Sequence, residues 1–133
     1  AFSRMAQDNE TMHVVVLSQI VQRLRCQSFF RHTFIPFFFS FFYFWTVYIL
    51  FLFSRRAALD LNYLFESHAY EQYQKFLDVE GDRLRQTPVM SDFLAFYGRN
   101  VRNEYELFEL IRNDELVHRN RSARESGYDS NAQ

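Results

Sequence analysis

Two short motifs in this 133-residue chain combine residue types that bind transition metals. One is Glu10-x-x-His13 near the start of the chain, and the other is Glu115-x-x-His118 near its end. Residues three apart on an α-helix share a face, so the glutamate and histidine of each motif can reach one metal site. Di-iron bundles take such a pair from each of two helices and a single glutamate from each of two others. The spacing therefore predicts a di-iron carboxylate centre, in which carboxylates bridge the irons and imidazoles supply nitrogen ligands.

A third helical segment offers a single glutamate for such a centre. Glu66 is one candidate, but Glu71 and His68 lie on the same segment, and spacing alone does not choose between the two glutamates. The ordinary alternative is that each Glu-x-x-His belongs to a solvated helix face, which is the usual origin of a single copy. With two copies on separate helices and a glutamate on a third, a metal site and a pair of solvated helix faces explain the motifs about equally well.

The elements that carry these residues are predicted to be helices, because the chain has only 3 glycines and 2 prolines to break them. In the first helix, Val14, Leu17, Val21 and Leu24 form the expected apolar stripe. Gly81 is the expected stop of the third helix, and Thr87-Pro88 lies in a connector. The expected helices span residues 2–25, 33–54, 55 or 57 to 79, 91–97 and 101–122.

The segment 33–54 is uncharged and rich in phenylalanine, and Arg31 and Arg55 lie just beyond its ends. An apolar run of about 18 residues or more normally indicates a helix in a membrane. Polar tips in mid-run, on Tyr43, Trp45 and neighbouring residues, favour a helix that lies in one leaflet, because Tyr and Trp prefer the membrane interface. We therefore predict membrane contact, in the plane of one leaflet rather than across the bilayer.

Composition limits the remaining possibilities. The length suits one domain, predicted over residues 1–122, followed by a disordered tail over 123–133 that is rich in Ser, Asn and charge. With 15 basic and 16 acidic residues, no charge excess points to a nucleic-acid partner. The single cysteine, Cys26, cannot form an internal disulfide.

The sequence around the candidate ligands resembles the alternative oxidase family, and most of all its plastid terminal oxidases. The segment that starts at Glu66, ESHAYEQYQKFL, is similar to the E-S-H-A-[FY]-x-T-Y-x-K-F segment of the plastid members. The segment IRNDELVH, which ends at His118, resembles their I-R-x-D-E-A-x-H, and NETMH, which ends at His13, resembles N-E-x-x-H. The resemblance extends from Gln7 to about Ser122. In both, a hydrophobic helix lies between the segment that ends at His13 and the one that starts at Glu66.

This resemblance implies roles for individual residues. The implied iron-site residues are Glu10, His13, Glu66, Glu115 and His118. Tyr73 matches a catalytic tyrosine beside the iron pair, and we expect its hydroxyl to hydrogen-bond to Asp114; the ordinary alternative for Tyr73 is a core aromatic. Asn9 and Asp114 match residues that orient the metal ligands.

The resemblance also implies a fold and an activity. The fold is all-α: a ferritin-like di-iron helical bundle, incomplete in this chain, with a hydrophobic membrane-associated helix. Family members hold two iron ions, oxidise quinol and reduce oxygen to water, and the implied quinol is plastoquinol, with ubiquinol as the alternative. The implied location is the thylakoid membrane of plastids, as a monotopic protein, or else the mitochondrial inner membrane. The resemblance implies that the protein binds membrane lipid. It also implies, as alternatives, a second copy of the chain in a homodimer or the subunits of a larger membrane complex.

The chain departs from the family pattern in ways that leave a second reading open. Family members have two more helices before the one that carries Glu10, and one of them supplies the remaining glutamate, which we expect from sequence outside this chain. Leu116 replaces the usual alanine, the usual glycine pair after the first motif is absent, and the loop before the last helix is short. The alternative function is therefore a non-catalytic structural subunit of a photosynthetic or respiratory membrane complex.

Overall fold

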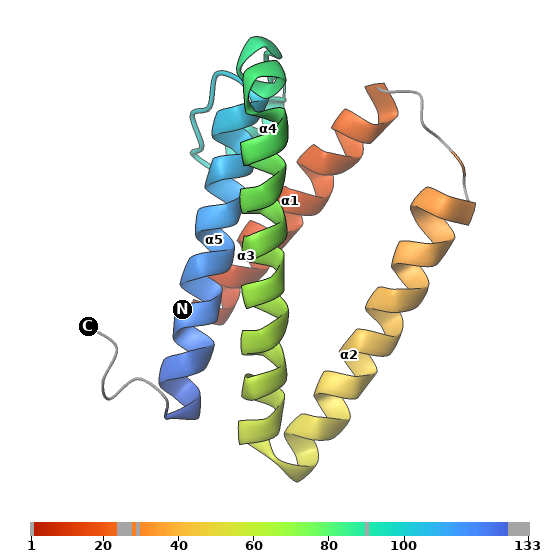
Figure 1. The fold of residues 1–133 in the computed structure, drawn as a ribbon. Helices are drawn as coiled ribbons and strands as arrows, with labels where there is room; N and C mark the ends of the chain where they lie inside the picture. Colours follow the sequence, from red (N-terminus) through yellow and green to blue (C-terminus); the bar gives the residue numbers. More distant parts are fainter. Residues whose placement is uncertain (1, 24–27, 29, 90, 128–133) are drawn as a thin grey trace.

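The computed structural model describes residues 2–23, 28, 30–89 and 91–127, and within these it is helical, with no β-strand. Helices α3 (Arg55–Gln86) and α5 (Glu104–Ser126) lie side by side and form the most extensive interface between elements. Helix α1 (Phe2–Arg23) crosses them obliquely and contacts α5 and the short helix α4 (Asp92–Phe96) (Figure 1). The predicted all-α fold is confirmed.

The core lies where α1, α3, α4 and α5 meet. Its buried members are Met12, Val16, Leu77, Leu84, Leu94, Leu107, Phe108 and Ile111. The apolar stripe predicted for the first helix is right in part: Leu17 packs against the core, but Val14 is 67% exposed, and Met12 and Val16 supply the fully buried side chains instead. The inward face of α1 also carries His13, so the helix is oriented by polar contacts as well as by apolar ones. The predicted continuation to Arg25 lies outside the described residues.

Helix α2 (Ile35–Phe53) diverges from α3 like one arm of a V (Figure 1). It follows a π-helical turn over Phe30–Phe34 and has Pro36 in its first turn, as expected. A single residue, Ser54, separates α2 from α3: its backbone is extended and its side chain accepts a hydrogen bond from the backbone N–H of Ala57. The third helix therefore begins at Arg55, the earlier of the two predicted starts.

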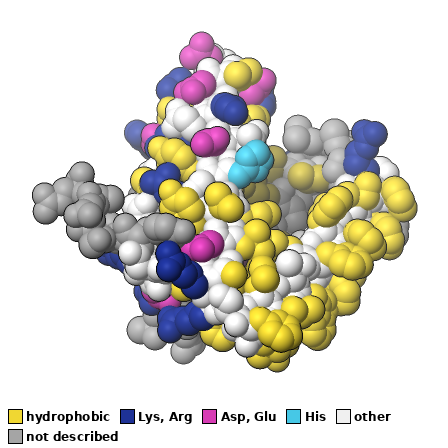
Figure 2. Space-filling model, turned by 60° about the horizontal axis from the view of Figure 1, so that its bottom comes forward, with side chains coloured by type: hydrophobic (Ala, Val, Ile, Leu, Met, Phe, Trp, Pro, Cys, Tyr) yellow, Lys and Arg dark blue, Asp and Glu magenta, His cyan; other side chains and the backbone are white. Residues whose placement is uncertain are grey.

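No residue of α2 is buried, and Figure 2 shows its hydrophobic side chains gathered along one side of the molecule. Within the described chain it is the one helix whose length and composition would allow it to cross a membrane. The predicted apolar helix is therefore present, at nearly the predicted bounds.

Gly81 does not end the third helix, which was a wrong prediction. The helix continues to Gln86 and stops at Thr87, whose extended backbone precedes Pro88. Gly81 is buried, and a Cβ there would lie 3.1 Å from Nη1 of Arg85 on the same helix and at ordinary contact distance, 3.4 Å, from the ring of Tyr105. The glycine thus lies within the helix, facing Tyr105 of α5, rather than at a chain break.

The last helix is displaced from its predicted bounds at both ends. It begins at Glu104, because Asn103 caps it by accepting a hydrogen bond from the N–H of Glu106 and because Asn103 pairs with Pro88 in an isolated β-bridge. It ends at Ser126, four residues beyond the predicted Ser122, where Gly127 adopts the left-handed conformation at φ 87°. Residues 123–126 are therefore helical rather than part of a disordered tail, and 128–133 lie outside the described residues. Helix α4 is one residue shorter at each end than predicted.

Candidate metal centre

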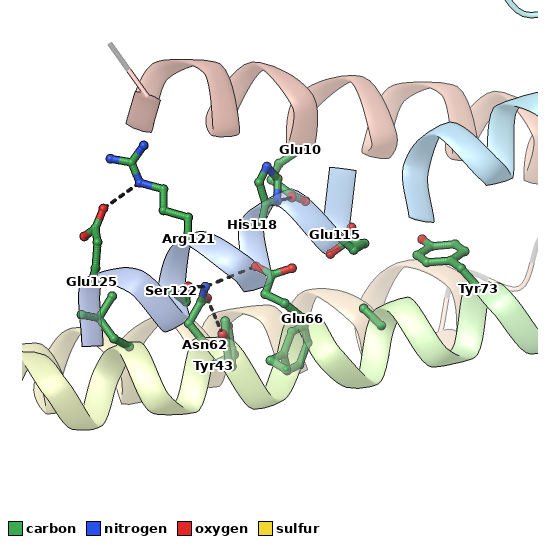
Figure 3. Close-up of a pocket in the computed structure, with 13 residues that line it drawn as sticks. Glu10, Tyr43, Asn62, Glu66, Tyr73, Glu115, His118, Arg121, Ser122 and Glu125 are labelled. Carbon is green, nitrogen blue, oxygen red and sulfur yellow. Dashed lines mark hydrogen bonds and ion pairs between the residues drawn. The ribbon is translucent and has the colours of Figure 1, made fainter. Parts of the chain in front are cut away.

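The two Glu-x-x-His motifs meet across the contact between α1 and α5. The Nδ1 atom of His118 lies 3.2 Å from Glu10, and Nδ1 of His13 lies 3.6 Å from Glu115. Each histidine therefore faces the glutamate of the opposite motif. Both histidines and Glu115 are buried, whereas the Glu10 side chain is 53% exposed. The helical spacing puts each pair on one face, and the crossing of the helices brings the two faces together. Figure 3 shows Glu10 of α1 beside His118 of α5.

Glu66 of α3 joins this cluster. Glu66, Glu115 and His118 offer ligand atoms within 4.8 Å of one another, and so do Glu10, His13 and Glu115. Glu115 belongs to both groups and so links them into one polar centre. The rivals on α3, Glu71 and His68, are both exposed. The orientation of α3 thus brings Glu66 to the cluster, a choice that spacing alone left open and that the family resemblance implied.

Concentrated negative charge dominates the electrostatics of this centre. Burial, the hydrogen bond with Glu66 and the charges of nearby carboxylates raise the pKa of Glu115 to about 10. The hydrogen bond with Glu10 is the main reason why the pKa of His118 is also raised. Without a cation, the protein must therefore keep protons in this cluster. A divalent cation bound there would replace those protons as the compensating positive charge.

A second set of polar contacts lies behind His13. Its Nε2 atom is 3.2 Å from Asp114, and Arg99 donates to both carboxylate oxygens of Asp114, at 3.2 and 3.3 Å. Arg99 also donates to the side-chain oxygen of Asn9, at 3.2 Å. Asp114 therefore lies against a candidate ligand, as expected, and Asn9 reaches the same network through Arg99. Arg99 was not predicted, because it lies in the loop after α4 and only the tertiary fold brings it here.

Tyr73 lies on α3, beyond Glu66 toward the core, and its half-buried ring lies 6.3 Å from that of Phe108. Burial and the charges of Glu115 and Glu10 raise the pKa of Tyr73 to about 12. The predicted hydrogen bond from Tyr73 to Asp114 is wrong: Asp114 is engaged by His13 and Arg99, and the Tyr73 hydroxyl makes no hydrogen bond within the described chain. The phenol instead faces the space beside the carboxylates.

A pocket of about 810 Å³ opens beside the cluster. Residues from α1, α2, α3 and α5 line it, including Glu10, Glu66, Glu115, His118 and Tyr73. Tyr43, Asn62 and Ser122 also line it, and none of them was predicted as a site residue (Figure 3). Asn62 occupies the turn before Glu66, which is the only sequence signal that could have indicated it.

Comparison with known proteins decides the family. The sequence model of the family described as alternative oxidase matches residues 5–124. This chain belongs to the alternative oxidase family. Among curated proteins, a plastid relative from Arabidopsis thaliana named "Ubiquinol oxidase 4, chloroplastic/chromoplastic" is 31% identical over 99 residues, covering 59% of this chain. The chain spans 28% of the length of that relative. No solved structure matches the chain. The plastid alternative-oxidase resemblance seen in the sequence is confirmed, and the helical bundle agrees with the fold of the family.

Proposed function

We propose that this chain is part of a quinol:oxygen oxidoreductase of the alternative-oxidase type, with a di-iron carboxylate centre at the cluster around Glu115. The observation that carries the proposal is the pair of candidate ligand groups that share Glu115 and combine both Glu-x-x-His motifs with Glu66. Membership of the family supports the same reading, and so does the name of the plastid relative.

The donor set fits iron. Carboxylates and imidazoles in a helical bundle are the ligands of di-iron carboxylate proteins, and the proposed ligands are Glu10, His13, Glu66, Glu115 and His118. The di-iron pattern takes four carboxylates, and the described residues bring three of them together. We expect a further helix, outside this chain, to supply the fourth at the exposed edge of the cluster beside Glu10. When bound, an iron pair supplies the electron transfer that reduces dioxygen.

The residues of this chain would then divide the remaining work. Asp114 holds His13 in one orientation, and Arg99 holds Asp114. Glu115 keeps its carboxyl proton at neutral pH in the absence of a cation and would release it when a metal binds. Tyr73 places a protonated phenol beside the carboxylates, where it can donate a proton during oxygen reduction. Two quinols in turn each lose two electrons and two protons to become quinones, and one dioxygen takes the four electrons and four protons to become two waters.

We also propose that the substrate arrives from a membrane. The pocket is lined by Tyr43 of the unburied apolar helix α2 as well as by the carboxylates, which supports a lateral path for quinol along α2. The name of the relative, chloroplastic/chromoplastic, supports a plastid location over the mitochondrial inner membrane. The same name gives its substrate as ubiquinol, so plastoquinol and the thylakoid membrane rest on the family resemblance alone. Homodimer contacts and association with a larger complex remain predictions from the family resemblance.

The test is iron content and turnover of the full-length polypeptide. We expect about two irons per chain and oxygen consumption that depends on added quinol. His118→Ala removes a proposed ligand and should lose much of the iron, whereas Asn120→Ala, on the exposed side of α5, should keep it. A full-length protein that folds but holds no iron would contradict the proposal and favour the structural-subunit alternative.

A further inference from the structure

Asn62 lies half-buried on α3, one helical turn before Glu66, and every polar atom of its side chain is used. Its amide nitrogen donates to Oε1 of Glu66, at 3.3 Å, and to the hydroxyl of Ser122 on α5, at 2.9 Å. Its amide oxygen accepts a hydrogen bond from the hydroxyl of Tyr43 on α2, at 3.2 Å. One side chain therefore connects three helices to a carboxylate of the candidate metal centre (Figure 3).

The chemistry of these partners fixes the orientation of the amide. The Glu66 carboxylate oxygen can only accept, so the amide nitrogen must face it, and the amide oxygen must then face Tyr43. The hydroxyls of Tyr43 and Ser122 can both donate and accept, so they adapt to that orientation. The contact holds one oxygen of Glu66 and leaves the other for a cation.

The contact between α2 and α3 supports the same arrangement. The Tyr43 ring lies 4.5 Å from that of Phe65, the residue before Glu66. The hydroxyl of Tyr43 therefore reaches Asn62 from a ring that is itself packed on α3. Ser122 is buried on α5, which holds the second partner in place.

We propose that Asn62 is a positioning residue that orients Glu66 for metal binding, and that Tyr43 of the apolar helix and Ser122 act through Asn62. This inference rests on the proposed function, because it takes Glu66 as a metal ligand. Partners that hold a metal ligand from behind commonly change metal affinity by about 10- to 100-fold when they are removed. A purely structural tie between helices would instead change the stability of the metal-free protein and leave metal affinity alone.

The experiment measures Fe²⁺ affinity under anaerobic conditions in the full-length polypeptide, after its metal has been removed. Asn62→Leu keeps the approximate volume and removes the amide, and we expect it to weaken Fe²⁺ binding about 10-fold or more. Asn120→Leu is the matched control, because it makes the same exchange at an exposed position of α5. Its Fe²⁺ affinity should equal that of the unmodified protein. The visible absorption of bound Co²⁺ should change in Asn62→Leu and not in the control.

A double-mutant cycle tests whether Tyr43 acts through Asn62. Tyr43→Phe and Ser122→Ala should each weaken Fe²⁺ binding less than Asn62→Leu does, because each removes one support of the amide. Adding Tyr43→Phe to Asn62→Leu should cause no further loss, since the intermediary is already gone. A further loss of the same size as in the single variant would overturn this part of the proposal.

The outcomes separate the two proposals. If the unmodified protein binds no Fe²⁺, the proposed function itself fails. If it binds Fe²⁺ and Asn62→Leu binds equally well, the positioning role is wrong while the metal centre stands. Should Asn62→Leu fail to fold, the milder Tyr43→Phe and Ser122→Ala decide, and unchanged Fe²⁺ affinity in both would overturn the role.

Discussion

At the scale of single residues, the hydroxyl of Tyr73 lies beside several carboxylates but makes no hydrogen bond within the described chain. Its ring packs near Phe108, and carboxylates lie close enough to raise its pKa to about 12. Its hydroxyl has no hydrogen-bond partner in the described chain, so the group contributes little to stability as a bond. Its ring packs against the core while its hydroxyl lines the pocket beside Glu115, so its position fits both a core aromatic and the proposed proton donor.

We expect Tyr73→Phe to lower quinol oxidation by about 10-fold or more, because the variant removes a proton donor from the reaction site. The free energy of unfolding should change by less than about 1 kcal/mol, since no hydrogen bond is lost. Tyr63→Phe, elsewhere on α3, is the control and should leave turnover unchanged. Chemical denaturation and oxygen uptake measure the two quantities. Full turnover in a well-folded Tyr73→Phe protein would remove the phenol from the mechanism.

Arg99 is the other residue whose importance depends on its contacts. It donates to Asp114 and Asn9, and Asp114 in turn contacts His13. Asp114 is buried, so loss of its cationic partner leaves a carboxylate with fewer donors in a poorly solvated place. The guanidinium thus holds α1, α5 and the loop after α4 together behind one candidate ligand.

Arg99→Leu should lower the free energy of unfolding by about 1–3 kcal/mol, as expected when a buried carboxylate loses hydrogen bonds. It should also weaken iron binding about 10-fold, because His13 is held less firmly. Arg102→Leu breaks only an exposed pair with Glu106 and should leave both quantities nearly unchanged. Urea denaturation and iron titration measure the two quantities. If the two variants have the same free energy of unfolding and the same iron affinity, the Arg99 network contributes no more than a surface ion pair.

At the scale of elements, α2 is the helix whose environment matters most. Its 19 residues correspond to about 28 Å at 1.5 Å per residue, close to the thickness of a bilayer core. Tyr43 and Thr46 donate their hydroxyl hydrogens to groups of the protein, so these two residues do not favour an in-plane helix over a spanning one. Trp45 and Tyr48 stay exposed. A stronger reason is that mid-helix Tyr43 contacts Asn62, beside Glu66, so a spanning α2 would draw carboxylates toward the bilayer centre at high cost.

We therefore expect both ends of α2 to lie on the same side of a membrane. Ser28→Cys and Arg55→Cys, each made with Cys26→Ser, would place one thiol near each end. A membrane-impermeant thiol reagent added outside sealed vesicles should then label both variants or neither. Detergent should make both sites reactive, which controls for thiols that are merely shielded. Labelling of only one variant from outside would show that the helix spans.

At the scale of the whole molecule, the clustered carboxylates make the stability of the metal-free bundle depend on pH. The folded-state pKa of Glu115, about 10, lies above its unfolded value of 4.5, so the folded protein binds a proton that the unfolded chain releases. Stability from this proton is fully present below pH 4.5 and is lost as the pH rises toward 10. His118 also has a raised pKa, so its contribution falls in the same direction as the pH rises.

The metal-free protein should consequently unfold at a lower temperature at pH 9 than at pH 5. The limiting slope is about 1.4 kcal/mol per pH unit for each proton by which the two states differ. Glu115→Gln keeps the shape and cannot ionise, so it should flatten the dependence. Thermal unfolding followed by circular dichroism in the presence of a chelator measures it. An equal dependence in Glu115→Gln would mean that Glu115 is already ionised in the folded protein and does not cause the loss of stability.

The sequence by itself determined the local features: long helices, an apolar helix bracketed by arginines, and a Glu-x-x-His pair on one face of each of two helices. These depend on helical period and composition, which a single segment carries whole. The terminal bounds of α5 and the role of Gly81 could not be read in this way. Caps and close approaches between helices depend on partners such as Tyr105, far along the chain.

Only the tertiary structure decided which polar groups meet. The family resemblance implied Glu66, but residue spacing did not choose it over Glu71. That choice follows from the rotation of α3 against α5, because the helical period of one segment does not show which of its faces a distant helix will cover. Arg99 and Asn62 join the site because the fold closes over long sequence separations, 15 residues to Asp114 and 60 to Ser122. Hydrogen bonds of this kind act over about 3 Å, so they are set by the packing of helices rather than by the spacing of residues within one helix.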